Sequence, residues 1–203
     1  AAMCGIAGIL YKGQGQGERG EEPLAARQAR DRAHLAAHLP VDDLQAARSA
    51  CSLPVLRKDF IVGPYQIHEA RAAEADAILL IVRCLSDEEL KDFSKVAKSL
   101  GMEVLVETHT AKEIERALNA GAHIIGINNR DLDTLEVDVN RSLELKKLVP
   151  GGNILVSESG IYTRSQVQKL EDGGVDAILV GESLLTSNDI RAKIQELLGH
   201  DEG

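Results

Sequence analysis

The sequence has no tryptophan, and its aromatic residues are limited to three tyrosines and two phenylalanines among 203 residues. It therefore lacks the stacking platforms that single-strand nucleic-acid binders use to hold bases. It also lacks basic runs, and 23 Lys and Arg against 32 Asp and Glu give a net charge of −9. Affinity for a phosphate backbone comes from clustered basic side chains. We therefore expect no nucleic-acid partner, and an aliphatic core.

Cysteine is also scarce, since only Cys4, Cys51 and Cys84 occur, and no CxxC or Cys/His ligand spacing is present. This pattern indicates neither a disulfide framework nor a zinc site. Among the six histidines, only His34 and His38 have a helical i, i+4 spacing, and two ligands without a third usually share a helix face. No apolar run approaches the roughly 18–20 residues of a membrane span. We expect no metal, no membrane association and a cytoplasmic location.

The sequence does contain a regular alternation of two kinds of segment. With 44% hydrophobic and 27% charged residues, it is typical of one soluble globular unit. From about residue 53, short β-branched or Leu-rich runs alternate with longer amphipathic stretches, which is the pattern of βα units around a parallel sheet. The runs have almost no polar alternation, as in strands buried on both faces. We predict strands at 54–58, 77–82, 104–107, 124–128, 154–158 and 177–181.

Helix signals fill the stretches between these strands. Ser86 precedes three acidic residues as a capping residue, and Gly101, Gly121 and Gly173 follow helices where a left-handed cap is needed. A short phrase recurs at 73–78, 120–125 and 173–178 with a period of about 25 residues per unit, as expected for a (βα) barrel or a doubly wound sheet. We predict helices at 41–50, 65–73, 87–100, 111–120, 139–148, 164–173 and 190–198.

The N-terminal part of the chain departs from this pattern. Residues 4–11 form a possible strand, residues 12–22 a Gly- and Gln-rich flexible loop, and residues 24–39 an Ala-, Arg- and Leu-rich helix. The chain thus supplies six clear strands and one possible strand, fewer than the eight that close a (βα)8 barrel. We treat residues 1–42 as an atypical N-terminal segment and residues 43–203 as the barrel region. The fold class expected is α/β, a TIM-barrel-like parallel sheet that is incomplete or modified at its N-terminal strands.

Polar residues stand at the carboxyl ends of the predicted strands, where side chains of parallel α/β folds converge on one mouth. A Lys and two Glu in otherwise apolar strands are hard to explain by packing, because burying an unpaired charge costs several kcal/mol. A buried ion pair or a solvated strand end would explain one such residue. The feature, however, recurs at successive strand ends: Lys58 and Asp59; Glu107; Asn128, Asn129 and Arg130; Glu158 and Ser159; and the turn 181–183.

These residues belong to six motifs: LPVLRKDFIV (53–62), PYQI (64–67), LVE (105–107), IGINNRDL (125–132), VSESGI (156–161) and LVGESL (179–184). Together the motifs resemble the indole-3-glycerol phosphate synthase family of tryptophan biosynthesis. The resemblance runs from about Asp43 to the C-terminus and implies a (βα)8 barrel. It also implies the conversion of 1-(2-carboxyphenylamino)-1-deoxyribulose 5-phosphate to indole-3-glycerol phosphate, with release of carbon dioxide and water and without metal or organic cofactor.

The resemblance assigns catalytic roles to Lys58, Glu107, Asn128 and Glu158. Lys58 would protonate the substrate carbonyl during ring closure, and Glu107 would be the general base of the later proton removal. Asn128 would orient the substrate and neighbouring carboxylates, and Glu158 would line the carboxyphenyl pocket. The chemistry is consistent, since a Lys among carboxylates stays protonated and a Glu near cations stays ionised.

The resemblance also assigns substrate contacts. Phe60 would pack on the aromatic ring, Arg130 would orient the substrate, and Ser159 would line the carboxyphenyl pocket beside Glu158. Gly160 and the turn formed by Gly181, Glu182 and Ser183 follow the last two strands, where these barrels bind phosphate with backbone N–H groups. Ordinary βα turns are the alternative explanation for these glycines.

One part of the family pattern is absent. The family's first strand carries a Glu and a Lys two residues apart, followed by Ser-Pro-Ser, and nothing of that kind precedes Leu53. We therefore expect a phosphorylated small-molecule ligand with reduced or no turnover. The alternative is a noncatalytic, recombined or engineered barrel-fragment scaffold that still binds phosphate. An open barrel leaves two sheet edges, so we expect a homo-oligomer or cover by the 24–39 helix.

The segment MCGIAGIL at 3–10 is similar to the start of class II glutamine amidotransferases, in which an N-terminal Cys is the nucleophile. Here Ala1 and Ala2 precede Cys4, so Cys4 lacks the free α-amine that would act as its base. An apolar strand with an inert Cys is the favoured interpretation. The change in pattern near residue 40 indicates a chimeric or truncated chain.

Overall fold

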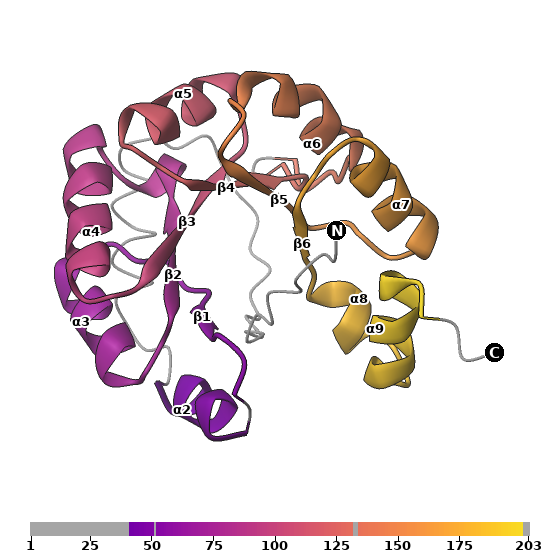
Figure 1. Ribbon diagram of the computed structural model, residues 1–203, viewed down its shortest axis with the longest axis horizontal. Helices are drawn as coiled ribbons and strands as arrows, with labels where there is room; N and C mark the ends of the chain where they lie inside the picture. The colour runs from indigo at the N-terminus through magenta and orange to yellow at the C-terminus, as the bar shows by residue number, and fades with distance from the viewer. Residues whose placement is uncertain (1–40, 51, 132–133, 201–203) are drawn as a thin grey trace.

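A computed structural model describes residues 41–50, 52–131 and 134–200, and the predictions for residues 1–40 lie outside this part. Six parallel strands form one sheet in sequential order, which curls into an arc with helices along its outer side (Figure 1). This curled half-barrel confirms the incomplete TIM-barrel-like fold and excludes a doubly wound sheet, whose strand order reverses. The strands are β1 (Leu56–Arg57), β2 (Ala77–Ile81), β3 (Glu103–Thr108), β4 (Ile124–Asn128), β5 (Ile154–Glu158) and β6 (Ala177–Leu179).

The helices lie close to their predicted positions. They are α2 (Val41–Ala50), α3 (Pro64–Ala72), α4 (Asp87–Ser99), α5 (Ala111–Asn119), α6 (Asn140–Leu145), α7 (Arg164–Asp172), α8 (Glu182–Leu185) and α9 (Ile190–Leu198). Two short 3₁₀ helices, η1 (Val82–Cys84) and η2 (Lys146–Leu148), were not expected, and neither was α8. The prediction of strand at Val82 is therefore wrong, as is strand at 180–181. In both places the chain leaves the sheet and turns at once.

The αβ turn marked by the recurring phrase has the same backbone in all three copies. Its second residue has a positive φ each time, at Glu74 (62°), Gly121 (79°) and Gly174 (75°). The prediction of a left-handed cap at Gly173 is thus wrong by one residue. Gly173 has φ −71° and is glycine for space, because a Cβ there would overlap the Leu143 side chain.

In two of its three copies, the recurring phrase also attaches the turn to the start of a neighbouring strand through an Asp side chain. The Asp76 carboxylate accepts a hydrogen bond from the Val55 backbone N–H at 2.7 Å, and Asp176 accepts one from the Leu155 N–H at 2.9 Å. These bonds satisfy backbone donors at the amino ends of the strands. They hold the successive βα units in register, which fixes the carboxyl ends at the opposite rim.

Side chains alternate between the two faces of the sheet. On β2, Ile78 and Leu80 pack in the core under the helices, whereas Leu79 and Ile81 pack in an inner cluster with Leu105. Because side chains alternate with a period of two residues, residues 105 and 107 of β3 also point inward, as do residues 156 and 158 of β5. The inner faces of β3 and β5 are thus apolar in their lower part and end in a carboxylate, Glu107 and Glu158 respectively. This register places the polar strand ends on one mouth.

Within the described residues, β1 and β6 are the edges of the sheet. The homo-oligomer expected from these edges, the cytoplasmic location and the division at residue 42 stay predictions. A search of the described helices found none long and apolar enough to cross a membrane.

Candidate active site

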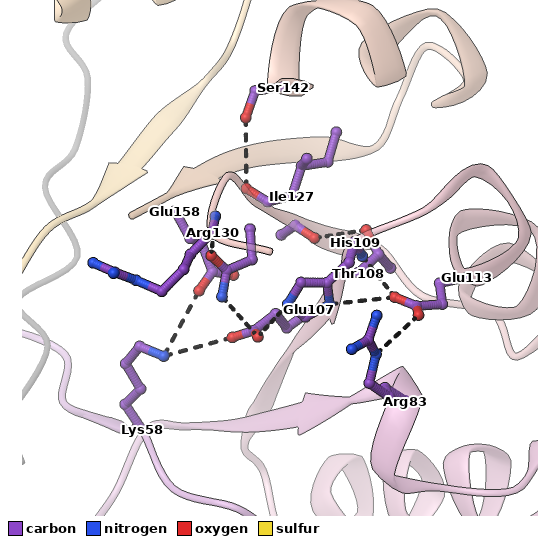
Figure 2. Close-up of polar contacts among 12 residues, drawn as sticks. Lys58, Arg83, Glu107, Thr108, His109, Glu113, Ile127, Arg130, Ser142 and Glu158 are labelled. Atoms are coloured by element: carbon purple, nitrogen blue, oxygen red, sulfur yellow. Dashed lines mark hydrogen bonds and ion pairs between the residues drawn. The ribbon is translucent and has the colours of Figure 1, made fainter. Parts of the chain in front are cut away.

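The predicted Lys and two Glu meet at the carboxyl ends of the strands. Lys58 follows β1, and its Nζ lies 3.5 Å from Glu107 Oε2 and 3.8 Å from Glu158 Oε2 (Figure 2). The carboxylate side chains are 3% and 1% exposed, whereas that of Lys58 is 36% exposed. One ammonium therefore stands between two buried carboxylates and the open side of the arc.

The position of Lys58 is set by residues on the other face of the same segment. Arg57 NH2 lies 3.1 Å from Asp59 Oδ2 and 2.7 Å from Glu69 Oε2 of α3. The guanidinium also donates to the backbone oxygen of Gln66 at 2.8 Å. A two-residue edge strand has few ladder bonds of its own. This clip to α3 keeps Arg57 and Asp59 outward and leaves Lys58 inward.

Gly126 of β4 makes room for the Glu158 carboxyl group. A Cβ at position 126 would overlap Glu158 Oε1. The Glu158 side chain is only 1% exposed, so a larger residue at 126 would push its carboxyl group away from Lys58. This glycine is part of the sequence motif, but the motif alone does not explain why a glycine is needed. The register between β4 and β5 explains it, because it pairs Gly126 with Val156 and Asn128 with Glu158.

The two asparagines after β4 have different surroundings. Asn128 Nδ2 donates to Glu107 Oε1 at 3.0 Å, and Asn128 Oδ1 accepts from the Arg130 N–H at 3.0 Å. Asn129 instead bonds to Ser157 Oγ at 2.9 Å, and its Oδ1 accepts from Ser142 Oγ at 2.8 Å. Asn129 is therefore part of a buried network that joins β4, β5 and α6. Asn128 alone faces the carboxylates.

The charges of this cluster divide between its members. Burial and the neighbouring Glu107 charge raise the pKa of Glu158 well above its ordinary value. Burial acts in the same direction on Glu107, but Lys58, His109 and Asn128 outweigh it and lower its pKa. Burial lowers the pKa of Lys58, but the two carboxylates outweigh it and raise the pKa. At neutral pH the arrangement favours a charged Lys58 and Glu107 beside a more readily protonated Glu158.

This division predicts how stability changes with pH. A carboxyl group whose folded pKa is raised binds more protons in the folded state, so stability falls as pH rises from its unfolded value through its folded value. We expect Glu158→Gln to remove this loss, so its stability relative to wild type should increase as pH rises above the ordinary Glu value of 4.5, by more than the roughly 0.5 kcal/mol of a surface substitution. Glu107, whose folded pKa is lowered, loses its contribution only as pH falls below its ordinary value of 4.5. Urea unfolding at several pH values measures the difference.

The control for this experiment is Glu144→Gln, since Glu144 is exposed on α6. We expect Glu144→Gln to change the free energy of unfolding by the same amount at every pH, within about 0.5 kcal/mol. Parallel pH profiles for wild type and Glu158→Gln would contradict the assignment of the raised pKa to Glu158.

A pocket of about 140 Å³ opens beside this cluster. All of the predicted residues at the ends of β5 and β6 line it, together with Lys58 and Arg130. Glu107 and Asn128 lie behind Lys58 and Glu158 rather than on its wall. Phe60 is not among the lining residues, and its predicted role is untested. The lining residues are Lys58, Arg130, Glu158, Ser159, Gly160, Ile161, Tyr162, Leu179, Val180, Gly181, Glu182 and Ser183.

The rim of the pocket carries a second charged pair that sequence reasoning missed. Arg130 NH2 lies 2.6 Å from Glu182 Oε2, across 52 residues of sequence. Burial and then the Glu182 carboxylate raise the pKa of Tyr162, which lines the same wall. The sequence placed Arg130 and Glu182 at separate strand ends, and only the closing of the arc brings them together.

The pocket floor has an unusual backbone. Ser159 and Gly160 follow β5 with φ of 69° and 74°. A non-glycine residue in this region is uncommon and is concentrated at functional sites. A Cβ at Gly160 would also overlap Val137, so glycine is needed there both for its φ and for space. Among the described residues, no group of three His, Cys, Asp or Glu side chains is arranged to hold a metal ion.

Together the fold and the site define a class of protein, a parallel (βα)-barrel protein with a polar mouth at the carboxyl ends of its strands. A solved structure titled "Native KDPGal structure" supports the fold alone, with a TM-score of 0.55, 17% identity, and coverage of 79% of this chain and 71% of that chain. The sequence matches the family model of indole-3-glycerol phosphate synthase over residues 40–197, and the chain belongs to this family.

Curated relatives agree with this assignment. Indole-3-glycerol phosphate synthase from Acetivibrio thermocellus is 52% identical over 155 residues, which cover 76% of this chain and 60% of the relative. The protein of the same name from Dehalococcoides mccartyi is 52% identical over 161 residues, covering 78% and 62%. The chain thus matches about three-fifths of the length of these relatives.

Proposed function

We propose that the chain carries the site of an indole-3-glycerol phosphate synthase-type carboxy-lyase of tryptophan biosynthesis. The reaction would be the ring closure, decarboxylation and dehydration of 1-(2-carboxyphenylamino)-1-deoxyribulose 5-phosphate. The observation that carries the proposal is the contact of Lys58 with both Glu107 and Glu158 beside a pocket. Family membership supports the same reaction.

The charges of the cluster suit the proposed roles. Lys58 keeps its proton between two carboxylates, so it is able to protonate the substrate carbonyl oxygen as the ring closes. Glu107 is the base that takes a proton from the ring in the later step, and its lowered pKa keeps it ionised beforehand. Glu158, with its raised pKa, limits the negative charge that the substrate carboxylate meets. Asn128 fixes the Glu107 carboxylate through its 3.0 Å hydrogen bond.

The far end of the pocket is proposed to take the substrate phosphate. Gly160, Gly181 and Ser183 line it, and the Ser183 hydroxyl is buried without a hydrogen-bond partner among the described residues. Unsatisfied buried hydroxyl groups are costly, so a ligand oxygen would stabilise this one. Arg130 is the cation on the same wall, and it would orient the substrate together with Ser159.

Reduced turnover is part of the proposal. The 52 residues before Leu53 contain no counterpart of the family's first-strand Glu and Lys followed by Ser-Pro-Ser. The second candidate function is a noncatalytic barrel-fragment scaffold that keeps phosphate binding. The absence of the first-strand residues also favours this scaffold function.

Titration with indole-3-glycerol phosphate tests the binding part of the proposal. We expect wild type to bind this product, and Arg130→Met to bind it about tenfold more weakly, since a hydrogen bond to a charged group contributes about 1.5–3 kcal/mol. Arg191→Met is the control, because Arg191 is exposed on α9, away from the pocket lining. Quenching of the product's indole fluorescence measures both.

The outcomes separate the two functions. Binding of inorganic phosphate without binding of the product would favour the scaffold. Equal product affinity for wild type and Arg130→Met would remove Arg130 from the substrate site. If neither ligand binds, both candidate functions fail.

A further inference from the structure

The turn proposed to take the phosphate also carries a carboxylate. Glu182 belongs to this turn, and its Oε2 accepts a hydrogen bond from Arg130 NH2 at 2.6 Å. The next residue of the turn is Ser183, whose buried hydroxyl has no hydrogen-bond partner among the described residues and would accept or donate to a ligand oxygen. A carboxylate beside such a site needs an explanation, because it repels an anionic ligand.

The cations that line the pocket are both paired with acidic side chains. Lys58 Nζ lies within 3.8 Å of carboxylate oxygens of Glu107 and Glu158, and Arg130 contacts Glu182. Lys58 and Arg130 are the basic residues among the lining residues that the structure describes. An anion that enters the phosphate end of the pocket therefore has to share Arg130 with Glu182 or displace the Glu182 carboxylate from it.

Glu182 has two opposite effects on a bound phosphate, and their sizes decide its role. By holding Arg130 in place, it saves the ligand the cost of ordering one side chain, a factor of about 2–10 in affinity. Its charge acts against the ligand. Two like unit charges about 4 Å apart weaken binding roughly fivefold even in a water-like dielectric, and a phosphate dianion raises this factor to about 25. Repulsion therefore outweighs the positioning of Arg130.

The surroundings of the pair allow the two side chains to separate. The Arg130 and Glu182 side chains are 32% and 55% exposed, so water is able to solvate the Glu182 carboxylate once Arg130 turns to a ligand. Tyr162 lines the same wall, and burial followed by the Glu182 carboxylate raises its pKa, so its hydroxyl keeps its proton beside that carboxylate. The exchange of partners thus leaves neither charge buried without a partner.

We propose that the Glu182 carboxylate competes with ligand phosphate for Arg130: it holds the guanidinium while the pocket is empty and weakens the binding of a phosphate that takes its place. This inference rests on the phosphate part of the proposed function. It goes beyond that function because the Glu182 side chain opposes the binding that the backbone of its own turn supports. Differences in affinity at one site appear mostly in the dissociation rate, so Glu182 favours release of phosphorylated ligands.

Calorimetric titration with inorganic phosphate tests the competition without any reaction. Glu182→Gln keeps the size of the side chain and removes its charge, so we expect it to bind phosphate about tenfold more tightly than wild type at low ionic strength and about pH 8, where phosphate is a dianion. The gain should shrink at about 1 M salt, where charges are screened beyond about 3 Å. Unchanged phosphate affinity would overturn the proposal. Weaker binding would also overturn it and would make Glu182 a positioning residue for Arg130.

Two further variants serve as controls. Glu171 Oε2 lies 2.7 Å from Arg164 NH2 on α7, a pair of similar length and exposure outside the pocket lining, so Glu171→Gln should leave phosphate affinity within twofold. The double variant Arg130→Met/Glu182→Gln loses a cation and an anion together. We expect it to bind phosphate within about threefold of wild type, since the two charge effects are of similar size. A double variant that binds as tightly as Glu182→Gln alone would show that Arg130 is not the group for which the anions compete.

Titration of the same variants with indole-3-glycerol phosphate separates this inference from the proposed function. If wild type binds this product and Glu182→Gln has unchanged phosphate affinity, the competition by Glu182 is refuted and the proposed function stands. If Glu182→Gln gains phosphate affinity and none of the proteins binds the product, the competition stands and the lyase function is refuted. If neither wild type nor Glu182→Gln binds phosphate, the competition is refuted together with the phosphate site.

Discussion

Assayed beside an intact family member, the 203-residue chain is expected to form indole-3-glycerol phosphate at least 10⁴-fold more slowly. The family's first strand supplies a Lys near the developing charge of the substrate and a Glu that partners it, and neither has a counterpart before Leu53. Preorganised electrostatic groups contribute roughly 10²–10³ each to kcat. Losing two of them multiplies the effects, because among residues 41–50, 52–131 and 134–200 Lys58 is the one Lys whose ammonium contacts Glu107 or Glu158.

Product binding should fall much less than turnover. The phosphate contacts proposed at Gly160 and the turn 181–183 use backbone N–H groups, which belong to the described half-barrel. Only interactions that strengthen in the transition state change kcat, whereas uniform contacts change affinity. The comparison therefore needs both a steady-state fluorescence assay and a titration. The full-length enzyme from Acetivibrio thermocellus is a suitable reference.

A turnover within tenfold of the reference would refute this prediction. It would mean that a residue of the N-terminal segment, such as Lys12 or Arg19, has taken the vacant role. Lys12→Ala and Arg19→Ala then become the variants that identify it. With the expected slow rate, the same two substitutions should leave turnover unchanged.

The parts of the fold that the sequence predicted are those that local chemistry determines. The strands at 124–128 and 154–158 have the predicted bounds, because apolar β-branched runs end at a clear polar residue. Ser86 caps α4, as predicted from the three acidic residues that follow it, and its side chain accepts from the Glu89 N–H. The strand at 54–58 shortens to Leu56–Arg57, since an edge strand pairs on one side and its ends are held by side chains instead.

The candidate site was predictable only where each residue stands at a strand end. Lys58, Glu107, Asn128 and Glu158 are on one mouth because parallel strands align their carboxyl ends. His109 stands one residue beyond β3, but the sequence did not indicate that the Glu113 side chain accepts a hydrogen bond from its backbone N–H at 2.6 Å. The role of Gly126 also needed the structure, since it depends on a neighbouring strand. Contacts between strands and loops depend on the pairing register of neighbouring strands, and this register cannot be read from a single sequence.

The second large effect concerns stability, and we expect Lys58→Met to destabilise the fold by about 2 kcal/mol at about pH 8. Removing one partner of a fully buried ion pair costs about 3–5 kcal/mol, because the remaining charge is left uncompensated. Lys58 is about one-third exposed, so solvent screening reduces that figure. The pKa of Lys58 is raised above its usual 10.5, so its stabilising charge is fully present at this pH and is lost only in stronger alkali.

The cost should depend on pH and on Glu158. Near pH 5 the Glu158 carboxyl group is readily protonated, so the variant leaves less uncompensated charge and is expected to lose less stability. The double variant Lys58→Met/Glu158→Gln should recover much of the loss, because residues in contact couple by about 0.5–3 kcal/mol. Urea unfolding followed by circular dichroism is the appropriate measurement, since the chain has no tryptophan to report by fluorescence.

Lys95→Met provides the matched control. Lys95 Nζ lies 3.3 Å from Asp92 on α4, but its side chain is 76% exposed, and exposed pairs of this kind contribute about 0–1 kcal/mol. If Lys58→Met costs no more than Lys95→Met at about pH 8, the two buried carboxylates do not depend on the ammonium. In that case Glu107 and Glu158 must share a proton between themselves, and Lys58 would be free to leave the cluster when a ligand enters the pocket.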